Sequence, residues 1–336
     1  MTDEADLKTL GEFGLIDRIA RQLSAGTGVV LGIGDDAAAY TPSPGRLSLI
    51  TTDMLIEGIH FDLSFCDPLS LGKKTVSANL SDIAAMGGNP RFFLLSLAIP
   101  PAMTLDFLDT CIKGMLQRAE QFDVHLIGGD TCSSSGPLVI SLTVLGEQTP
   151  ELLVRRSGAQ PGDQICVTGT IGDSALGLCL LQQGERLGNA IIRHLDPEPR
   201  VYEGLALAEA TIPSSMIDLS DGLLADLGHI LDLSSVGAQV FSEALPLSET
   251  FREHFPTVTE KALSLALAGG EDYELLFTVP PEKIPKVFPL LDKLGTQVSV
   301  IGTITAERNL AVIGPDGREI SLQRKGFDHF SERDKK

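Results

Sequence analysis

Six short segments of this chain place an acidic residue beside small residues where a run of apolar residues ends. They are Gly34-Asp35-Asp36, Thr51-Thr52-Asp53, Leu80-Ser81-Asp82, Gly128-Gly129-Asp130, Asp218-Leu219-Ser220-Asp221-Gly222 and Gly269-Gly270-Glu271-Asp272. One isolated aspartate in such a place is typical of a turn or a helix cap. The repetition indicates more, because acids at the ends of strands and helices collect where the backbone can approach a ligand closely.

Many carboxylates around one pocket repel each other, because like charges disfavour ionisation. Binding hard cations relieves that repulsion. Magnesium prefers oxygen ligands, keeps several waters and commonly binds through one or two carboxylates together with substrate phosphates. The six segments therefore predict a magnesium-dependent site for a polyphosphate.

Strands and helices are expected to alternate along the chain, which predicts an α/β or α+β fold. Expected strands lie at 29–33, 47–52, 91–99, 125–127 and 138–145, and expected helices at 12–23, 67–86 and 104–122. A stretch rich in Pro, Gly and charge at 147–163 precedes a second set of strands and helices. The length of 336 residues suits two domains, which we predict at 1–148 and 149–336.

The segment after Asp218 is predicted to begin a helix, with Ser220 or Asp221 as its N-cap. Apolar residues recur there at helical spacing, at Leu223, Leu224, Leu227, Ile230 and Leu231. Asp218 and Asp221 would then contribute the second domain's share of a metal cluster. The other members are expected in the first domain, at Asp35 or Asp36 and at Asp53, Asp82 and Asp130.

Charge and cysteine content exclude several classes of function. The net charge is −19, the pI is about 4.6 and the chain has no basic stripe, so nucleic-acid binding is not expected. The five cysteines are dispersed without a Cys-x-x-Cys pair, which disfavours zinc ribbons and suits a reducing compartment. The chain starts polar and acidic, and its longest apolar run, near 92–99, is too short for a bilayer. We therefore expect a cytoplasmic protein without a membrane partner.

Two segments resemble common nucleotide-binding motifs, but each lacks a feature that its motif requires. Gly32-Ile33-Gly34-Asp35-Asp36-Ala37 fits a loose dinucleotide fingerprint, but its two acids would face a pyrophosphate without a cation. Gly72-Lys73-Lys74-Thr75 resembles the end of a phosphate-binding loop, but Asp67 stands where the upstream glycine is needed. A nicotinamide site and a P-loop are both disfavoured.

The chemical class of the phosphoryl acceptor can be inferred from how few side chains could act as its general base. An alcohol acceptor needs a general base, and His60 is the histidine closest to an acid cluster. A phosphate acceptor needs none, because a phosphomonoester is already mostly dianionic at pH 7. Its difficulty is charge repulsion, which metals and an arginine relieve. The second case fits the many acids better, with Arg156 as a candidate clamp that is also compatible with a plain surface position.

Taken together, the motifs resemble those of the thiamine-monophosphate kinase family. That family belongs to a superfamily with aminoimidazole ribonucleotide synthetase, selenophosphate synthetase and a hydrogenase-maturation protein. The resemblance runs in order from about Gly11 to Phe330. Besides the six acidic segments, it is carried by Asn79-Leu80-Ser81-Asp82-Ile83-Ala84-Ala85-Met86-Gly87, Leu126-Ile127-Gly128-Gly129-Asp130-Thr131, Arg156-Ser157-Gly158-Ala159, Val167-Thr168-Gly169-Thr170, Gly269-Gly270-Glu271-Asp272-Tyr273-Glu274-Leu275 and Lys325-Gly326-Phe327-Asp328-His329-Phe330.

The resemblance implies ATP-dependent phosphorylation of thiamine phosphate to thiamine diphosphate, by direct in-line transfer assisted by several Mg²⁺ ions. It also implies a homodimer built through the N-terminal domain, which binds ATP and metal, and a C-terminal α/β domain that completes the site. The implied metal ligands are Asp36, Thr51, Thr52, Asp53, Asp82, Asp130, Asp218 and Asp221. The implied ATP contacts are Phe122, Gly129, Asp130, Arg156 and Ser220, and the implied thiamine phosphate contacts are His60, Glu271 and Phe327.

Two positions depart from the family pattern. Thr51 stands where serine is common, and Phe122 stands where a tyrosine is frequent, so a phenol hydrogen bond is lost there while stacking is kept. Whether Asp35 also binds metal is left open by the residues themselves; the family pattern favours Asp36.

Two other functions were weighed. A superfamily relative that activates an amide or a selenide with ATP is one, but a selenophosphate synthetase needs a reactive cysteine near its start, and the first cysteine here is Cys66. A non-catalytic nucleotide-binding protein is the other, but such a protein would have lost acids, and the set is complete.

Overall fold

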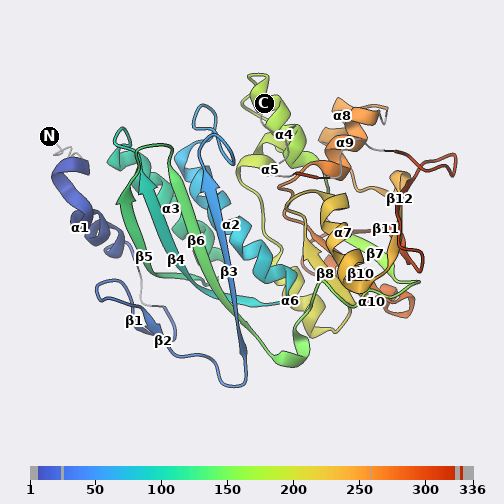
Figure 1. Cartoon of the computed structure of the whole chain (residues 1–336), viewed down its shortest axis with the longest axis horizontal. Coiled ribbons are helices and arrows are strands. Elements are labelled where there is room, and N and C mark those ends of the chain that lie inside the picture. The colour runs from blue at the N-terminus through green and yellow to red at the C-terminus, as the bar shows by residue number, and fades with distance from the viewer. Residues whose placement is uncertain (1–6, 24–25, 258, 322–325, 328–336) are drawn as a thin grey trace. The chain divides into compact units, whose positions relative to one another are not determined.

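The computed structural model describes residues 7–23, 26–257, 259–321 and 326–327 (Figure 1). The chain divides into two compact units. Unit 1 is made by the chain up to Ile83 together with Asn89–Pro150, and unit 2 by Ala84–Gly88 together with the chain from Glu151 onward. Each unit has its own mixed sheet and its own helices, so the fold is α/β with two domains.

Unit 1 contains a four-stranded sheet of order β3-β6-β4-β5, in which only the β4–β5 pair is parallel. Its elements are α1 (Leu7–Ala20), β1 (Val29–Leu31), β2 (Ala39–Tyr40), β3 (Leu47–Ile56), α2 (Pro68–Ala85), β4 (Asn89–Ile99), α3 (Leu105–Gln121), β5 (His125–Ser133) and β6 (Val139–Gln148). β1 and β2 form a separate antiparallel pair.

Helices α2 and α3 lie side by side on one face of this sheet (Figure 1). Two glycines allow their close approach: a Cβ on Gly72 would lie 1.9 Å from the Cys111 carbonyl oxygen, and one on Gly114 would lie 2.1 Å from that of Leu69. Gly72, which the sequence places in an apparent phosphate loop, is therefore a helix-packing residue.

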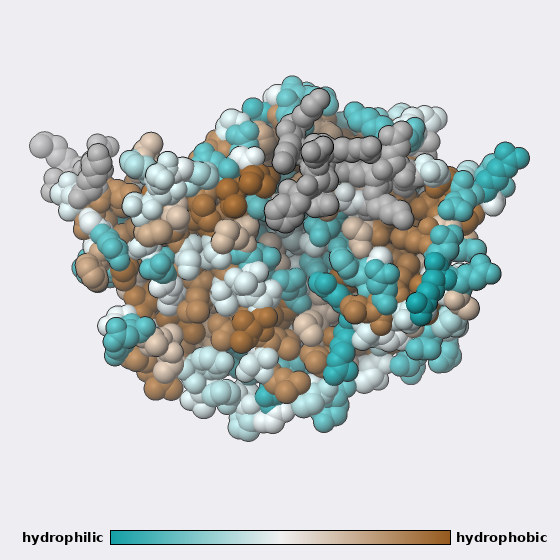
Figure 2. All heavy atoms as spheres, in the orientation of Figure 1, coloured by the Kyte–Doolittle hydropathy of each residue, from teal (hydrophilic) through white to brown (hydrophobic). Residues whose placement is uncertain are grey.

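On the other face of the sheet, Tyr40 of β2 packs against Phe92 of β4, but the described residues of unit 1 leave part of β3 exposed. Alternate residues of β3 point to opposite faces, and Leu49 and Leu55 are buried while Ile50 is 68% and Met54 55% exposed. Figure 2 shows hydrophobic residues among neutral ones over this face. The alternation of buried and exposed residues thus leaves apolar side chains uncovered on one side of β3.

Unit 2 contains a six-stranded sheet of order β12-β9-β11-β7-β10-β8, antiparallel except for the β12–β9 pair. Its strands are β7 (Gln164–Thr168), β8 (Ser215–Asp218), β9 (Gly237–Phe241), β10 (Leu275–Val279), β11 (Val298–Thr305) and β12 (Leu310–Ile313). Its helices are α4 (Asp173–Gln182), α5 (Asn189–Leu195), α6 (Val201–Glu209), α7 (Leu223–Ser234), α8 (Glu249–His254), α9 (Glu260–Ala268) and α10 (Ile284–Asp292). β8 and β10 are buried along their whole lengths.

Several boundaries differ from the sequence prediction. The first helix begins at Leu7 and is interrupted at Gly11, which has a φ of 70°. β5 extends to Ser133 instead of ending at Ile127, because it pairs with β4 along its whole length. The short elements α5, α8, β8 and β12 were not predicted. No helix of the described residues is long and apolar enough to cross a membrane.

Candidate active site

In unit 1, β3 and α2 bring together three of the predicted metal ligands. Thr51 and Asp53 point to the same side of β3, and the Thr51 hydroxyl donates a hydrogen bond to the Asp82 carboxylate on α2. Burial, and secondly the charge of Asp82, raise the pKa of Asp53 to about 6. A buried carboxylate beside a second negative charge, as Asp53 is, is a candidate ligand for a cation.

Thr52 lies on the opposite side of β3, because neighbouring strand residues alternate. Its hydroxyl donates to the Leu142 carbonyl oxygen at 2.9 Å and accepts from the Thr143 hydroxyl at 3.1 Å, both on β6. The structure therefore groups Thr51 and Asp53 with Asp82, and does not add the Thr52 side chain to them.

Asp36 and Asp130 are exposed in unit 1. Asp36 follows β1, and its N–H donates to the Asp35 carboxylate at 2.9 Å, so Asp35 is occupied by its neighbour's backbone. Asp130 lies in β5 after Gly129, where a Cβ would lie 1.9 Å from the Leu95 carbonyl oxygen. Only glycine fits beside β4 at that position, which explains the Gly-Asp sequence.

Phe122 and His60 also belong to unit 1. Phe122 ends α3 and is only 7% exposed, while its N–H donates to the Ala119 carbonyl oxygen at 3.1 Å. His60 lies in the turn after β3, where its Nδ1 accepts from the Ile56 N–H at 3.0 Å. That bond assigns the ring proton of a neutral His60 to Nε2, the nitrogen facing away from the turn's backbone.

In unit 2, two loops carry most of the predicted residues and are joined by backbone hydrogen bonds. The loop after β8 contains Ser220 and Asp221, and the turn before β10 contains Glu271. The Glu271 N–H donates to the Ser220 carbonyl oxygen at 2.8 Å, and the Tyr273 N–H to that of Leu219 at 2.8 Å. Residues about fifty positions apart therefore lie side by side, with the buried Asp218 at the end of β8 beside them.

Phe327 joins the same group. Its N–H donates to the Asp221 carbonyl oxygen at 3.0 Å, and the residue is 37% exposed. The neighbouring Gly326 packs against α7, since a Cβ there would lie 2.4 Å from that of Ala225. The motif residues Lys325, Asp328, His329 and Phe330 lie outside the described residues.

The predicted N-cap of α7 is wrong. Gly222 occupies the cap position without a side-chain hydrogen bond, and Asp226, in the first turn of α7, closes the loop instead. One carboxylate oxygen of Asp226 accepts from the N–H groups of Ser220, Asp221 and Gly222 at 3.0, 3.2 and 3.1 Å. The cap is thus made from inside the helix, and neither Ser220 nor Asp221 provides it with its side chain.

Asp226 is an additional member of the acid group of unit 2. Burial raises its pKa to about 8, and the charges of Asp218 and Asp221 add to the effect, against the lowering by the Asp221 and Gly222 N–H groups. Arg156 is exposed in the segment that runs beside the start of β8, where the preceding Arg155 accepts from the Met216 N–H at 2.9 Å. None of the described contacts joins Arg156 to the acid group.

Magnesium fits the donor chemistry of both acid groups. All the side-chain donors are hard oxygens, and the pKa values of Asp53 and Asp226 are raised by burial and, secondly, by neighbouring carboxylates. Among the residues that the structure describes, no three His, Cys, Asp or Glu side chains converge on one metal position. Carboxylate pairs completed by water and phosphate oxygens are the usual arrangement for magnesium.

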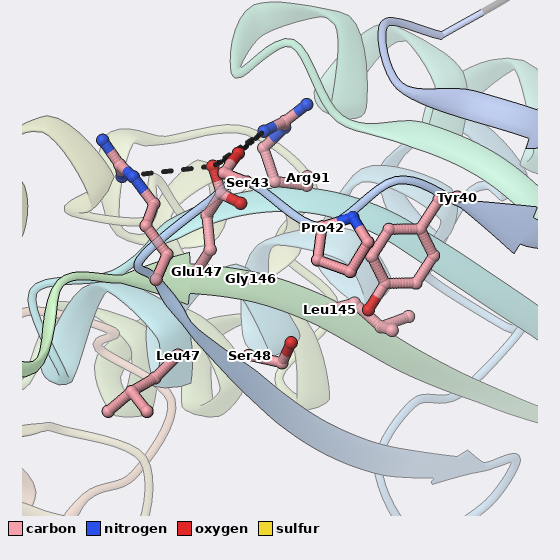
Figure 3. Close-up of a pocket in the computed structure, with 10 residues that line it drawn as sticks. Tyr40, Pro42, Ser43, Leu47, Ser48, Arg91, Leu145, Gly146 and Glu147 are labelled. Carbon is pink, nitrogen blue, oxygen red and sulfur yellow. Dashed lines mark hydrogen bonds and ion pairs between the residues drawn. The ribbon is translucent and has the colours of Figure 1, made fainter.

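A small pocket elsewhere in unit 1 is closed by its own ion pairs (Figure 3). Glu147 accepts from Arg91 Nη1 at 2.7 Å and from the Ser43 hydroxyl at 2.8 Å, and Arg46 lies 4.0 Å away. Burial would raise the pKa of Glu147, but these hydrogen bonds and the charge of Arg91 lower it on balance. The arginines are engaged by a carboxylate of the protein, so we assign this pocket no ligand.

Sequence reasoning missed three residues that contact this site. Asp226 follows Gly222 by four positions, and an acid in the first turn of a helix could have indicated its role. Ser174 and His194 lie beside Glu271, with the Ser174 hydroxyl 3.1 Å and the Glu271 Oε2 3.4 Å from His194 Nδ1. Nothing in the sequence indicates that pairing, because the residues are far apart along the chain.

Residues 34–148 match the AIR synthase related protein N-terminal domain family, and residues 160–315 match the corresponding C-terminal domain family. Thiamine-monophosphate kinase of Escherichia coli (strain K12) is 41% identical over 328 residues, covering 96% of this chain and 98% of that protein. The Bacillus subtilis (strain 168) enzyme of the same name is 35% identical over 329 residues, covering 96% of this chain and 100% of that protein.

Solved structures agree. A crystal structure of thiamine-monophosphate kinase from Stenotrophomonas maltophilia K279a has a TM-score of 0.81 and 39% identity, covering 91% of this chain and 96% of that one. A structure described as AaThiL complexed with AMPPCP and TMP has a TM-score of 0.74 and 34% identity, covering 96% and 98%. On this full-length similarity, the chain belongs to the thiamine-monophosphate kinase family of AIR synthase related proteins.

Proposed function

We propose that the protein transfers the terminal phosphoryl group of ATP to thiamine phosphate, giving thiamine diphosphate. The observation that carries the proposal is the pairing of the 219–222 loop with the 269–274 turn. It places proposed metal ligands, a proposed ATP contact and proposed substrate contacts of unit 2 in one group. Family membership and the relative solved with AMPPCP and TMP support the choice of substrates.

Each residue is assigned one role, except Asp130, which we assign to both metal and ATP. The metal ligands are Asp36, Thr51, Thr52, Asp53, Asp82, Asp130, Asp218 and Asp221, with Thr52 limited to a main-chain oxygen by the direction of its side chain. The ATP contacts are Phe122, Gly129, Asp130, Arg156 and Ser220. The thiamine phosphate contacts are His60, Glu271 and Phe327, and the half-exposed Phe327 ring offers a stacking surface to the substrate's rings.

The proposed transfer is direct and in-line, with the acceptor phosphate as nucleophile. No general base is required, because that phosphate is already ionised at neutral pH. Bound magnesium ions neutralise the charge on the transferring group and bring two anions together. The protein's own part is to hold the ligands in position, which the paired loops of unit 2 and the Thr51–Asp82 hydrogen bond of unit 1 provide.

We also propose that two copies of the chain pair through unit 1. The partly exposed face of its sheet carries Ile50 and Met54, which are more than half exposed. Apolar side chains in neighbouring places on a strand are the kind of surface that a homodimer buries.

The activity is tested by coupled ADP release with thiamine phosphate, with free thiamine and without an acceptor. Of the three reactions, we expect turnover only in the one that contains thiamine phosphate, and we expect mass spectrometry to identify thiamine diphosphate as the product. A rate that is the same without thiamine phosphate, or no turnover in any condition, rejects the proposal.

The site is tested by Asp221→Asn, which should lower kcat by at least about tenfold at fixed magnesium concentration. Asp316→Asn is the matched control, since Asp316 lies exposed in the turn after β12. The control should stay within about twofold of the wild-type rate. Full activity of Asp221→Asn would remove Asp221 from the assigned site.

A further inference from the structure

Each acid of the turn at 269–274 is contacted by a different residue or pair of residues at the start of α4 or on α5. Asp272 accepts from the N–H groups of Gly172 at 2.7 Å and Ser174 at 3.2 Å, at the start of α4. Glu274 is fully buried and accepts from Arg193 of α5. His194, the next residue of α5, lies beside Glu271.

The turn needs this support because its backbone is strained. Glu271 and Tyr273 have φ values of 68° and 51°, in the left-handed region that residues other than glycine rarely adopt. A Cβ on Gly270 between the loops would lie 2.5 Å from the Ser220 carbonyl oxygen, so the turn is also pressed against its neighbour. Its conformation is therefore set by its contacts and not by local preference.

The His194 ring is placed to orient the Glu271 carboxylate. Its side chain is 5% exposed, and its Nδ1 lies 3.4 Å from Glu271 Oε2 and 3.1 Å from the Ser174 hydroxyl oxygen. An ionised carboxylate can only accept, so a hydrogen bond from His194 to Glu271 needs the proton on Nδ1, and the Ser174 hydroxyl oxygen then accepts from the same N–H. Ser174 adds a second contact to the same nitrogen and limits rotation of the ring. The Glu271 side chain itself is 27% exposed, so it can reach a ligand.

We propose that His194, supported by Ser174, is a positioning residue that sets the direction of the Glu271 carboxylate for thiamine phosphate. His194 does not touch the substrate and acts through Glu271. The inference rests on the proposed function, in which Glu271 contacts the acceptor. It extends the site to α4 and α5, which carry none of the residues assigned from the sequence.

The alternative is that His194 is only a packing residue of unit 2. The two roles differ in what they change. A packing role affects the stability and all kinetic constants together, while a positioning role affects the KM for thiamine phosphate and depends on Glu271.

The test compares His194→Ala with His194→Asn, whose amide nitrogen can take the place of Nδ1. We expect His194→Ala to raise the KM for thiamine phosphate about tenfold, the usual effect of losing a hydrogen bond to a charged group, and to leave the KM for ATP within about twofold. His194→Asn should restore most of the loss. His254→Ala, an exposed histidine at the end of α8, is the matched control and should behave as wild type.

A double-mutant cycle completes the test. In a Glu271→Ala background, which removes the acceptor, His194→Ala should add less than about a twofold change in the KM for thiamine phosphate. If His194→Ala does not fold, Ser174→Ala replaces it, with an expected rise of about threefold. Equal effects of Ala and Asn at 194, or a full effect of His194→Ala in the Glu271→Ala background, overturn the inference. Wild-type turnover of thiamine phosphate in the same assay keeps the proposed function separate from that outcome.

Discussion

Glu274→Gln is predicted to destabilise unit 2 strongly, although the two side chains have nearly the same shape. Glu274 is fully buried, and its carboxylate accepts from Arg200 Nε at 2.6 Å, from Arg200 Nη2 at 2.7 Å, from the Thr168 hydroxyl at 2.7 Å and from Arg193. Burial alone would lower the pKa of Arg200, and the charge and hydrogen bonds of Glu274 more than offset it and raise that pKa. The carboxylate is therefore what allows Arg200 to stay charged inside the unit.

The size of the effect follows from what the substitution leaves behind. The Arg193 side chain is 28% exposed and can turn toward solvent, while that of Arg200 is 14% exposed and cannot easily do so. Removing one partner of a buried ion pair costs about 3–5 kcal/mol. The glutamine oxygen keeps one or two of the hydrogen bonds, so we place the loss at the lower end, about 3 kcal/mol.

Thermal unfolding monitored by circular dichroism or calorimetry measures this loss. A domain of this size shifts its Tm by about 2–4 °C per kcal/mol, so Glu274→Gln should lower the Tm by about 6–12 °C. Glu282→Gln, at an exposed position before α10, is the control and should shift the Tm by no more than about 1–2 °C. A Tm of Glu274→Gln within that control range would refute the reasoning that the charge is essential to the buried network.

Three further predictions concern stability, strand packing and assembly. Burial raises the pKa of Asp272 to about 7, so the folded state holds this proton more tightly than the unfolded chain does. The stabilisation from this group therefore falls as pH rises from about 4 to about 7, and in urea unfolding Asp272→Asn should remove about 2 kcal/mol of that fall between pH 5 and 7. An unchanged dependence of the free energy of unfolding on pH would contradict this prediction. Gly129→Ala should lower the free energy of unfolding by about 1–3 kcal/mol and abolish ATP-dependent turnover, because its Cβ meets the β4 backbone; wild-type stability in the same unfolding experiment would contradict it. Ile50→Lys should convert the proposed dimer to a monomer in analytical ultracentrifugation, while the exposed Leu187→Lys in unit 2 should not; two identical sedimentation profiles would argue against that face.

Long, periodic elements were predictable from the sequence, and short ones were not. The bounds of α2 and α3 were predicted nearly to the residue, because their apolar patterns are sustained and their ends carry turn residues. Helices α5 and α8 have seven and six residues, too short for a stable pattern of their own. Their positions are decided by contacts with the rest of unit 2, which the sequence does not display.

The candidate site divides in the same way. Which acids matter could be inferred from motifs, but which side chains meet could not. Strand alternation alone would have separated Thr52 from Thr51 and Asp53, and that rule was available in the sequence. The pairing of Glu271 with Ser220 and His194 depends on the sheet order of unit 2, which brings the ends of β8 and β10 together. The prediction of a cap at Ser220 or Asp221 failed because Gly222 occupies the cap position and the loop is held by Asp226 from inside the helix.

The hydrogen bonds from the loop before α7 to Asp226 have a consequence for how nucleotides are recognised. The first N–H groups of a helix commonly form an anion cradle, which binds phosphate without metal. Here the three amides just before the first turn of α7, those of Ser220, Asp221 and Gly222, already donate to the Asp226 carboxylate. If a triphosphate binds at this loop, as proposed, those three amides are not open to it, and we expect its attraction to unit 2 to depend on the cations it brings. Nucleotide affinity measured after chelation should therefore collapse, and should not fall back to a weaker, metal-free mode of binding.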